Sequence, residues 1–441
     1  MSRAYQNGQG SMRLETLATH AGRDDLRELG LHAPPIDLST TYPVRELDDA
    51  VVSLSALAEG APRAAESVYS RLHSPTVRRF ELALAALESA DDAVAFASGM
   101  AAVTAALLAA GQTGRHVVAI RPIYGTTDHL LTSGLLGGRV TWTGAAGVAD
   151  AIRPDTGLVL LETPANPTLD LVDIADVVRQ AGSVPVAVDS TFATPILQQP
   201  LRHGAALVIH SATKFLGGHG DVLAGVVACS DQWAARLRQV RVATGAVLHP
   251  LAGYLLHRGL ATLPVRVERA QRTALVLARR LAGHEAVARV AYPGLPGFPG
   301  ERLLGGQMSG PGSMIAFEVA GGRAAAERLL ASLELITHAV SLGSTDTLIQ
   351  CPAALTHHLV DGESRSKSGV SEGLLRLSVG LEHVDDLWAD LLRGLAAADG
   401  ASADPAWQPD QRAALAESDR YATRRSSRAP RTGAEAAGRG R

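Results

Sequence analysis

The feature that most constrains the fold is a regular alternation between short apolar runs and helix-length segments. It extends from residue 67 to residue 258, and the runs consist of mostly apolar, often β-branched residues. They are His116–Ile120, Val140–Thr143, Leu158–Leu161, Val184–Val188, Leu207–Ile209 and Gly225–Ala228. Such runs, separated by helical segments, are typical of parallel strands joined by crossover helices. We therefore predict an α/β domain whose mainly parallel sheet is covered on both faces.

The rest of the chain divides into three parts. Residues 1–66 form a polar N-terminal arm with little periodicity. Residues 259–400 contain a long Arg/Ala/Leu helix at Val265–Ala282 and then β-rich runs, which predicts a smaller α+β domain. These runs are Ser313–Val319, Ile336–Ser341 and Leu374–Val379. Residues 401–441 lack apolar periodicity and carry eight arginines, so we expect a disordered tail, with binding of an acidic partner or nucleic acid as the alternative.

The composition argues against several classes of protein. Apolar residues make up 46% of the chain, enough for a sizeable core, and a formal charge of −3 disfavours a nucleic-acid binder. The longest apolar run, near Ala101–Ala110, is about half of a membrane span, and the N-terminus lacks the apolar segment of a signal peptide. We therefore expect no membrane partner and a cytoplasmic location. Two cysteines and the absence of HExxH and CxxC motifs give no support for a metal site.

Lysine is scarce, and this draws attention to Lys214. Of the 41 basic residues, only Lys214 and Lys367 are lysines and the others are arginines. Arginine cannot replace lysine where a deprotonated amine is needed. Lys214 follows an apolar run and precedes a glycine-rich turn, a position that desolvates the amine and lowers its pKa. No glycine directly precedes either lysine, as a P-loop requires. We predict that Lys214 forms a Schiff base with a carbonyl cofactor, the alternative being an ordinary surface lysine.

A Schiff-base lysine points to pyridoxal 5'-phosphate (PLP), and other positions match what this cofactor needs. Asp189 ends an apolar run and can keep the ring nitrogen protonated. Ser98, Gly99 and Met100 lie between an apolar run and a helix, where backbone N–H groups bind phosphate. Tyr124 follows another run and can stack on the ring. Each also has an ordinary alternative: a helix cap, a common α/β turn and a half-buried tyrosine.

Taken in order, the motifs resemble those of the Cys/Met-metabolism branch of fold-type-I PLP-dependent enzymes. This family includes cystathionine γ-lyase, cystathionine γ-synthase and methionine γ-lyase. The matching segments, spread over residues 14–392, are Glu15–Gly22, Tyr69–Arg71, Ser98–Met100, Ile123–Gly125, Glu162–Thr168, Val188–Pro195, Ser211–Asp221, Ala339–Gly343 and Leu374–Glu382. The resemblance implies the fold-type-I transferase architecture, with a mainly parallel seven-stranded-type sheet and a smaller C-terminal domain.

The resemblance also implies roles for individual residues. Lys214 would hold PLP and move protons, and Tyr124 would stack on the ring beside it. The remaining cofactor-binding residues would be Tyr69, Arg71, Ser98, Gly99, Met100, Asp189, Thr191, Ser211 and Thr213. Substrate would be bound by Asn166, Ser341 and Arg376, with the planar fork of Arg376 on the α-carboxylate. Tyr69 and Arg71 would reach the cofactor of a neighbouring subunit, which implies shared active sites in a homotetramer built as a dimer of dimers.

The substrate pocket is less clear from the motifs. Val68 and Val340 stand where family members that process cystathionine often have glutamates. Thr126 and the stretch 241–243 differ from methionine γ-lyases. We predict γ-elimination, through a β,γ-unsaturated intermediate, on an L-amino acid with a small or apolar Cγ leaving group. A thiol is the default, and a halide or activated oxygen ester in specialised metabolism stays open. The alternatives are γ-replacement, as in cystathionine γ-synthase or O-acylhomoserine sulfhydrylase, and a catalytically inert regulatory relative.

Overall fold

The computed structural model describes residues 12–358 and 362–399. The expected tail at 401–441 lies outside these residues. In the N-terminal arm the structure contains two helices that the sequence interpretation missed, α1 (Leu14–His20) and α2 (Leu47–Ala58). Ala50, Ser53 and Leu57 form the buried side of α2, so a stripe of small and apolar residues, rather than the polar average of the segment, determines its structure.

The larger sheet has seven strands in the order β1-β7-β6-β5-β4-β2-β3. Their bounds are β1 Asp92–Phe96, β2 His116–Ile120, β3 Arg139–Thr143, β4 Thr156–Glu162, β5 Val186–Asp189, β6 Leu207–His210 and β7 Gly225–Cys229. Only β7 runs antiparallel to its neighbours β1 and β6. The predicted mainly parallel sheet is confirmed, and each predicted run lies within two residues of a strand.

Both faces of this sheet are buried, which explains why its strands are apolar throughout rather than alternating. In β4, Leu158 and Leu160 pack into the core with helix α4, whereas Val159 and Leu161 pack on the opposite face with helix α7. The helices that follow α2 are α3 Pro75–Glu88, α4 Gly99–Ala110, α5 Gly125–Thr132, α6 Val148–Ala151, α7 Ile174–Ala181, α8 Thr194–Leu197, α9 Asp231–Thr244 and α10 Pro250–Leu260.

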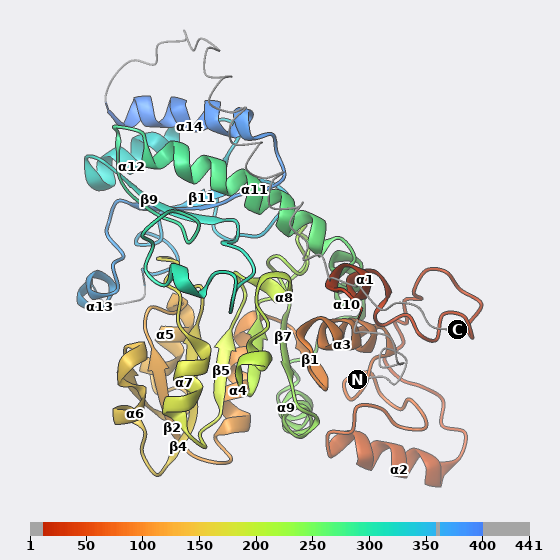
Figure 1. Cartoon of the computed structure of the whole chain (residues 1–441). Helices are drawn as coiled ribbons and strands as arrows, with labels where there is room; N and C mark the ends of the chain where they lie inside the picture. Colours follow the sequence, from red (N-terminus) through yellow and green to blue (C-terminus); the bar gives the residue numbers. More distant parts are fainter. Residues whose placement is uncertain (1–11, 359–361, 400–441) are drawn as a thin grey trace, which may run out of the picture. The chain divides into compact units, whose positions relative to one another are not determined.

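A second sheet of five strands has the order β10-β11-β12-β9-β8. Its strands are β8 Val287–Ala291, β9 Met314–Val319, β10 Thr337–His338, β11 Leu348–Gln350 and β12 Leu374–Ser378, and the helices of this region are α11 Leu263–Ala282, α12 Gly322–Ala331, α13 Gly362–Lys367 and α14 Val384–Ala398. Helices α12 and α14 pack against each other over this sheet, with the long α11 beside them (Figure 1). The predicted smaller α+β region is present, although β8 and β11 were not anticipated and the run at 336–341 contains only the two-residue β10.

The parallel strands bring several sequence motifs to one edge of the larger sheet. Glu162 and Asp189 end the adjacent strands β4 and β5 and are register partners, and Asp189 pairs in turn with Ile209 of β6. The segments that carry Tyr124 and Lys214 follow β2 and β6 at the same edge. Ligands of open α/β sheets bind at such carboxyl edges.

Candidate active site

Lys214 lies just beyond β6, where burial changes the chemistry of its amine. Burial, with a smaller contribution from the Arg376 guanidinium, lowers the pKa of Lys214 to about 8. Its Nζ donates a hydrogen bond of 2.7 Å to Ser341 Oγ, from the loop that follows β10. The structure thus brings Lys214, Ser341 and Arg376 together, with an amine that is easily deprotonated.

Asp189 is held at the end of β5 by Thr191, two residues further along the chain. Thr191 donates to Asp189 Oδ1 from its backbone N–H at 3.0 Å and from its hydroxyl at 2.5 Å. The same hydroxyl accepts from the backbone N–H of Ser211 at 2.9 Å, which ties β5 to the segment that leads to Lys214. Burial raises the pKa of the Asp189 carboxyl. Among the described residues, the two hydrogen bonds that Asp189 accepts from Thr191 both fall on Oδ1. Oδ2 therefore remains available to a cationic ligand group.

The start of α4 forms the predicted anion site. Ser98 caps the helix by accepting from the backbone N–H of Ala101 at 3.1 Å, which leaves the N–H groups of Gly99 and Met100 at the helix start. A Cβ atom on Gly99 would lie 2.9 Å from Ser211 Oγ, so glycine allows these two segments to meet. The Thr213 hydroxyl, predicted to bind the cofactor, already has partners within the protein. It donates to the carbonyl of Ala224 at 3.1 Å and accepts from the Ala224 N–H.

Arg376 is a buried guanidinium on β12, oriented by neutral groups. It donates to Asn166 Oδ1 at 2.8 Å and to the carbonyl of Ser341 at 2.9 Å. Its Nε has no partner among the described residues. Burial lowers the pKa of Arg376 to about 10, but the group keeps its positive charge near neutral pH. This arrangement suits an anionic ligand such as a carboxylate.

Glu162 belongs to the site, although sequence reasoning gave it no role. Its two carboxyl oxygens accept from the backbone N–H of Tyr124 at 2.7 Å and of Asn166 at 3.0 Å. Burial and the neighbouring Asp189 raise the pKa of Glu162 well above its usual value. Its signal in the sequence was a carboxylate at the end of an apolar run, as for Asp189.

Tyr69 and Arg71 have contacts on a different part of the molecule. Tyr69 is exposed and forms an isolated β-bridge with Thr41 of the N-terminal arm. Arg71 lies over the Tyr69 ring and donates to the carbonyl of Val242 in α9 at 2.9 Å. None of these three contacts involves Lys214 of the same chain.

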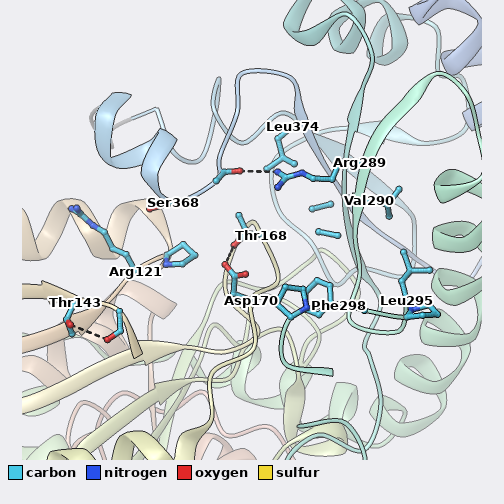
Figure 2. A pocket seen from close by; sticks show the side chains of 18 of the residues that line it. Arg121, Thr143, Thr168, Asp170, Arg289, Val290, Leu295, Phe298, Ser368 and Leu374 are labelled. Atoms are coloured by element: carbon cyan, nitrogen blue, oxygen red, sulfur yellow. Dashed lines mark hydrogen bonds between the residues drawn. The ribbon is translucent and has the colours of Figure 1, made fainter. Parts of the chain in front are cut away.

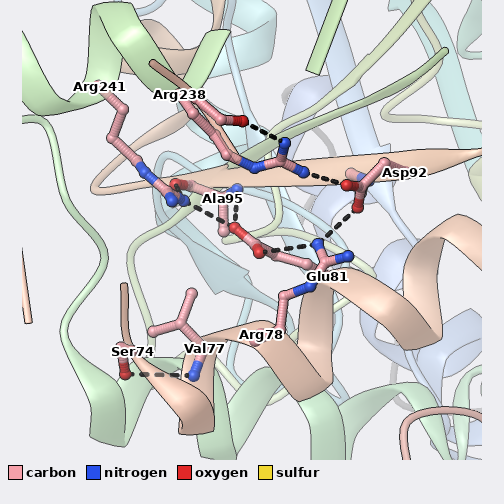
Figure 3. Close-up of polar contacts among 10 residues, drawn as sticks. Ser74, Val77, Arg78, Glu81, Asp92, Ala95, Arg238 and Arg241 are labelled. Carbon is pink, nitrogen blue, oxygen red and sulfur yellow. Dashed lines mark hydrogen bonds and ion pairs between the residues drawn. The ribbon is translucent and has the colours of Figure 1, made fainter. Parts of the chain in front are cut away.

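A buried ionic cluster lies next to the segment of α9 that contacts Arg71 (Figure 3). Glu81 of α3 accepts from Arg241 at 2.7 Å and from Arg78 at 3.3 Å. Asp92 of β1 accepts from Arg78 at 2.5 Å and also from Arg238. The cluster joins α3, β1 and α9, and Arg241 is the neighbour of Val242, which holds Arg71.

A groove of about 930 Å³ also opens between the larger sheet and the second sheet (Figure 2). Its charged residues are already paired: Arg289 with Glu318, Arg121 with Asp128, and Asp170 with the hydroxyl of Thr168. The residues that line the groove include none of the predicted site residues. It is therefore separate from the group around Lys214.

Comparison with known proteins identifies the family of this chain. The model of the Cys/Met metabolism PLP-dependent enzyme family matches residues 15–396. The chain belongs to this family. An L-methionine γ-lyase of Brevibacterium sandarakinum is 59% identical over 395 residues, which cover 89% of this chain and 100% of that protein. An L-methionine γ-lyase of Streptomyces avermitilis is 58% identical, over 88% of this chain and 90% of that protein.

Solved structures of related enzymes have the same fold. A cystathionine γ-synthase of Xanthomonas oryzae pv. oryzae, in complex with aminoacrylate and cysteine, superposes with a TM-score of 0.82 at 35% identity. The superposition covers 89% of this chain and 100% of that one. The expected family, fold, PLP dependence and lyase class are confirmed. Among the residues that the structure describes, no helix is both long enough and apolar enough to span a bilayer.

Proposed function

We propose that this PLP-dependent lyase is a methionine γ-lyase. It converts L-methionine and water to methanethiol, ammonia and 2-oxobutanoate. The observation that carries the proposal is the 59% identity to an L-methionine γ-lyase along that protein's whole length. The apolar Val68 and Val340, predicted to favour a neutral Cγ substituent, agree with it.

The residues fit the cofactor. Asp189 has a carboxylate oxygen free for a protonated ring nitrogen, and the α4 start offers N–H groups to a phosphate beside Ser211. Tyr124, whose backbone N–H donates to Glu162, would stack on the ring. Bound PLP supplies an electron sink for the negative charge that develops at the substrate Cα. These assignments are proposals that rest on the contacts above.

The protein side chains handle the substrate and its protons. Arg376 binds the α-carboxylate through its planar fork, and Asn166 and the Ser341 carbonyl keep that fork oriented. Lys214 Nζ, with a pKa of about 8, removes the proton from Cα and returns protons later in the reaction. Ser341 Oγ accepts a hydrogen bond of 2.7 Å from Nζ and would orient the amine toward the substrate. After Nζ has passed on its first proton, it takes a second proton, from Cβ, and the Cγ–S bond breaks. The thiolate takes up a proton and leaves as methanethiol, and water releases the remaining carbon skeleton as 2-oxobutanoate and ammonia.

Specificity constants test the proposal. Cystathionine has a distal ammonium group, and Val68 and Val340 offer it no carboxylate. We expect kcat/KM for L-methionine to exceed that for L-cystathionine by about a thousandfold. Replacing both valines by glutamate should reduce this ratio, whereas replacing both by isoleucine, the matched control, should preserve it. A wild-type preference for cystathionine would refute the proposal.

Replacement chemistry is the second candidate, because cystathionine γ-synthases are among the structural relatives. It predicts cystathionine formation from an O-acylhomoserine and cysteine. We also propose that the enzyme is a cytoplasmic homotetramer with shared sites. Cell fractionation tests the location and light scattering tests the assembly. A halide or oxygen-ester substrate in specialised metabolism stays a prediction for the same substrate panel.

A further inference from the structure

We propose that His357 is a positioning residue that keeps Asn166 and Arg376 aligned for the substrate α-carboxylate. The inference rests on the proposed role of Arg376 but not on the identity of the leaving group. His357 lies on the loop that follows β11, and its side chain is almost fully buried, with 3% of its surface exposed. Neither the motifs nor the proposed proton transfers involve it.

Polar contacts through Asn166 connect His357 to Arg376. The His357 Nε2 atom lies 3.2 Å from the carbonyl oxygen of Asn166, and the Asn166 side chain accepts from Arg376 at 2.8 Å. On the other side, His357 Nδ1 lies 3.1 Å from Thr356 Oγ1, which is 3.2 Å from the side-chain amide of Gln350. Because Arg376 has only donors, the amide presents its oxygen to the guanidinium, 2.7 Å from NH2.

The fold explains why these residues meet. Gln350 and Arg376 are register partners on the antiparallel strands β11 and β12, so their side chains share one face. The loop after β11 then turns back, with the His357 N–H bonded to the Pro352 carbonyl at 2.9 Å. It touches α5 directly, since a Cβ on Gly125 would lie 2.4 Å from the Thr356 carbonyl oxygen. His357 thereby lies against the start of α5 on one side and contacts Asn166, a partner of Arg376, on the other.

The charge state of His357 suits this role. Burial, together with the nearby Arg376, lowers the pKa of His357 to about 4, although the Asn166 and Ile123 backbone groups and Asp128 act in the opposite direction. The ring is therefore neutral near pH 7. Since a carbonyl only accepts, the single ring proton is on Nε2 and is donated to Asn166. This leaves Nδ1 to accept the one hydroxyl proton of Thr356, which is then not shared with the Gln350 oxygen. A neutral donor orients Asn166 without placing a second positive charge beside Arg376.

This neutrality matters for binding. The contacts described for Arg376, Asn166 Oδ1, the Ser341 carbonyl and the Gln350 oxygen, are all neutral acceptors. They orient the guanidinium but do not neutralise it. Glu162 also acts on Arg376 and raises its pKa, but burial and Asp189 raise the pKa of Glu162 itself and favour its uncharged form. The charge of Arg376 therefore remains available to a substrate carboxylate. If His357 is lost, Asn166 loses a donor at its carbonyl and the guanidinium loses a fixed neighbour. The expected defect is in carboxylate recognition, not in cofactor binding.

Ligand binding measured without turnover tests the inference. The holoenzyme is titrated with L-norleucine, which has the α-carboxylate but no leaving group, and with L-norleucinamide, which lacks the carboxylate, using the change in cofactor absorbance. For His357→Leu we expect Kd for L-norleucine to rise about tenfold or more, and Kd for the amide to change by less than about twofold. His357→Gln, which retains a side-chain N–H, should recover most of the norleucine affinity, and PLP content should match wild type.

Two further variants keep the test decisive. Thr356→Val removes only the hydroxyl beside Nδ1 and should weaken norleucine binding by about threefold, again sparing the amide, even if His357→Leu folds poorly. His116→Leu is the matched control, because His116 is a buried histidine between two threonine hydroxyls at the opposite end of β2. It should leave both Kd values unchanged.

Equal losses for norleucine and norleucinamide, or no loss for norleucine, would overturn the inference. Because neither ligand is turned over, failure of the methionine assay would not affect this result.

Discussion

At the scale of single residues, the depressed pKa of Lys214 makes a prediction about cofactor capture. Burial lowers this pKa from 10.5 to about 8, so the amine is protonated below pH 8 and free above it. The rate at which apoprotein binds PLP covalently should therefore rise about tenfold per pH unit up to about pH 8 and then level off. Stopped-flow absorbance measures this rate, with free Nα-acetyllysine as the control. A rate that keeps rising in parallel with the control to pH 10 would contradict the burial of Nζ.

The sequence alone could predict the positions of residues that directly follow or end a buried strand. Lys214 and Asp189 lie at the ends of apolar runs, and parallel strands bring such ends to one edge. His357 and Gln350 could not be found in this way. They reach Arg376 only through the register of β11 on β12 and a returning loop, and a three-residue strand leaves almost no periodic signal.

At the scale of elements, the cluster around Glu81 connects α3, β1 and α9. Burial acts to raise the pKa of Glu81, but Arg241, Arg78 and Arg238 outweigh it and hold the pKa at about 2. The folded pKa is therefore depressed, so this stabilisation is full above about pH 4.5 and is lost as the pH falls toward 2.

Replacing Glu81 tests how the elements are held together. Glu81→Gln leaves the buried Arg241 without its counter-charge and should lower the free energy of unfolding by about 3–5 kcal/mol. Denaturant titration of the apoprotein measures this loss. Glu327→Gln breaks an exposed helical pair with Arg323 and should lower the free energy of unfolding far less than Glu81→Gln does. Equal effects of the two substitutions would show that the cluster contributes no more than a surface pair.

The sequence predicted elements well where burial is two-sided. The strands of the larger sheet were found within two residues, because strands covered on both faces are continuous apolar runs. The half-exposed β8 and the helices of the N-terminal arm were missed. In these segments charged residues are interleaved with the packed ones, and only the tertiary contacts show which side is buried.

At the scale of the whole molecule, the N-terminal arm exposes many apolar side chains. Leu47, Val52 and Val51 are 73%, 68% and 54% exposed, and Tyr69 is exposed near them in sequence. Large exposed apolar groups gathered on one segment are typical of a subunit interface. This supports the proposal that Tyr69 and Arg71 act in a neighbouring active site.

Mixed oligomers test the shared site. Arg71→Ala and Lys214→Ala should each be inactive or weakly active alone. When the two chains are unfolded together, refolded and verified as mixed dimers, one site combines an intact lysine with an intact arginine. Each mixed dimer has one competent site of two, so activity should recover to about half of the wild-type value for purified mixed dimers. It should recover to about one quarter for the randomly paired mixture, in which about half of the dimers are mixed. No recovery in verified mixed oligomers would contradict the shared geometry.

The central claim is that Lys214 drives γ-elimination from methionine, and product analysis tests it most directly. Purified holoenzyme is incubated with L-methionine, and 2-oxobutanoate, ammonia and methanethiol are quantified, with the folded Lys214→Ala variant as the control. We expect the three products in equal amounts from the wild-type enzyme and a rate reduced by at least about a thousandfold for the variant. Consumption of methionine without 2-oxobutanoate, or comparable turnover by Lys214→Ala, would contradict it.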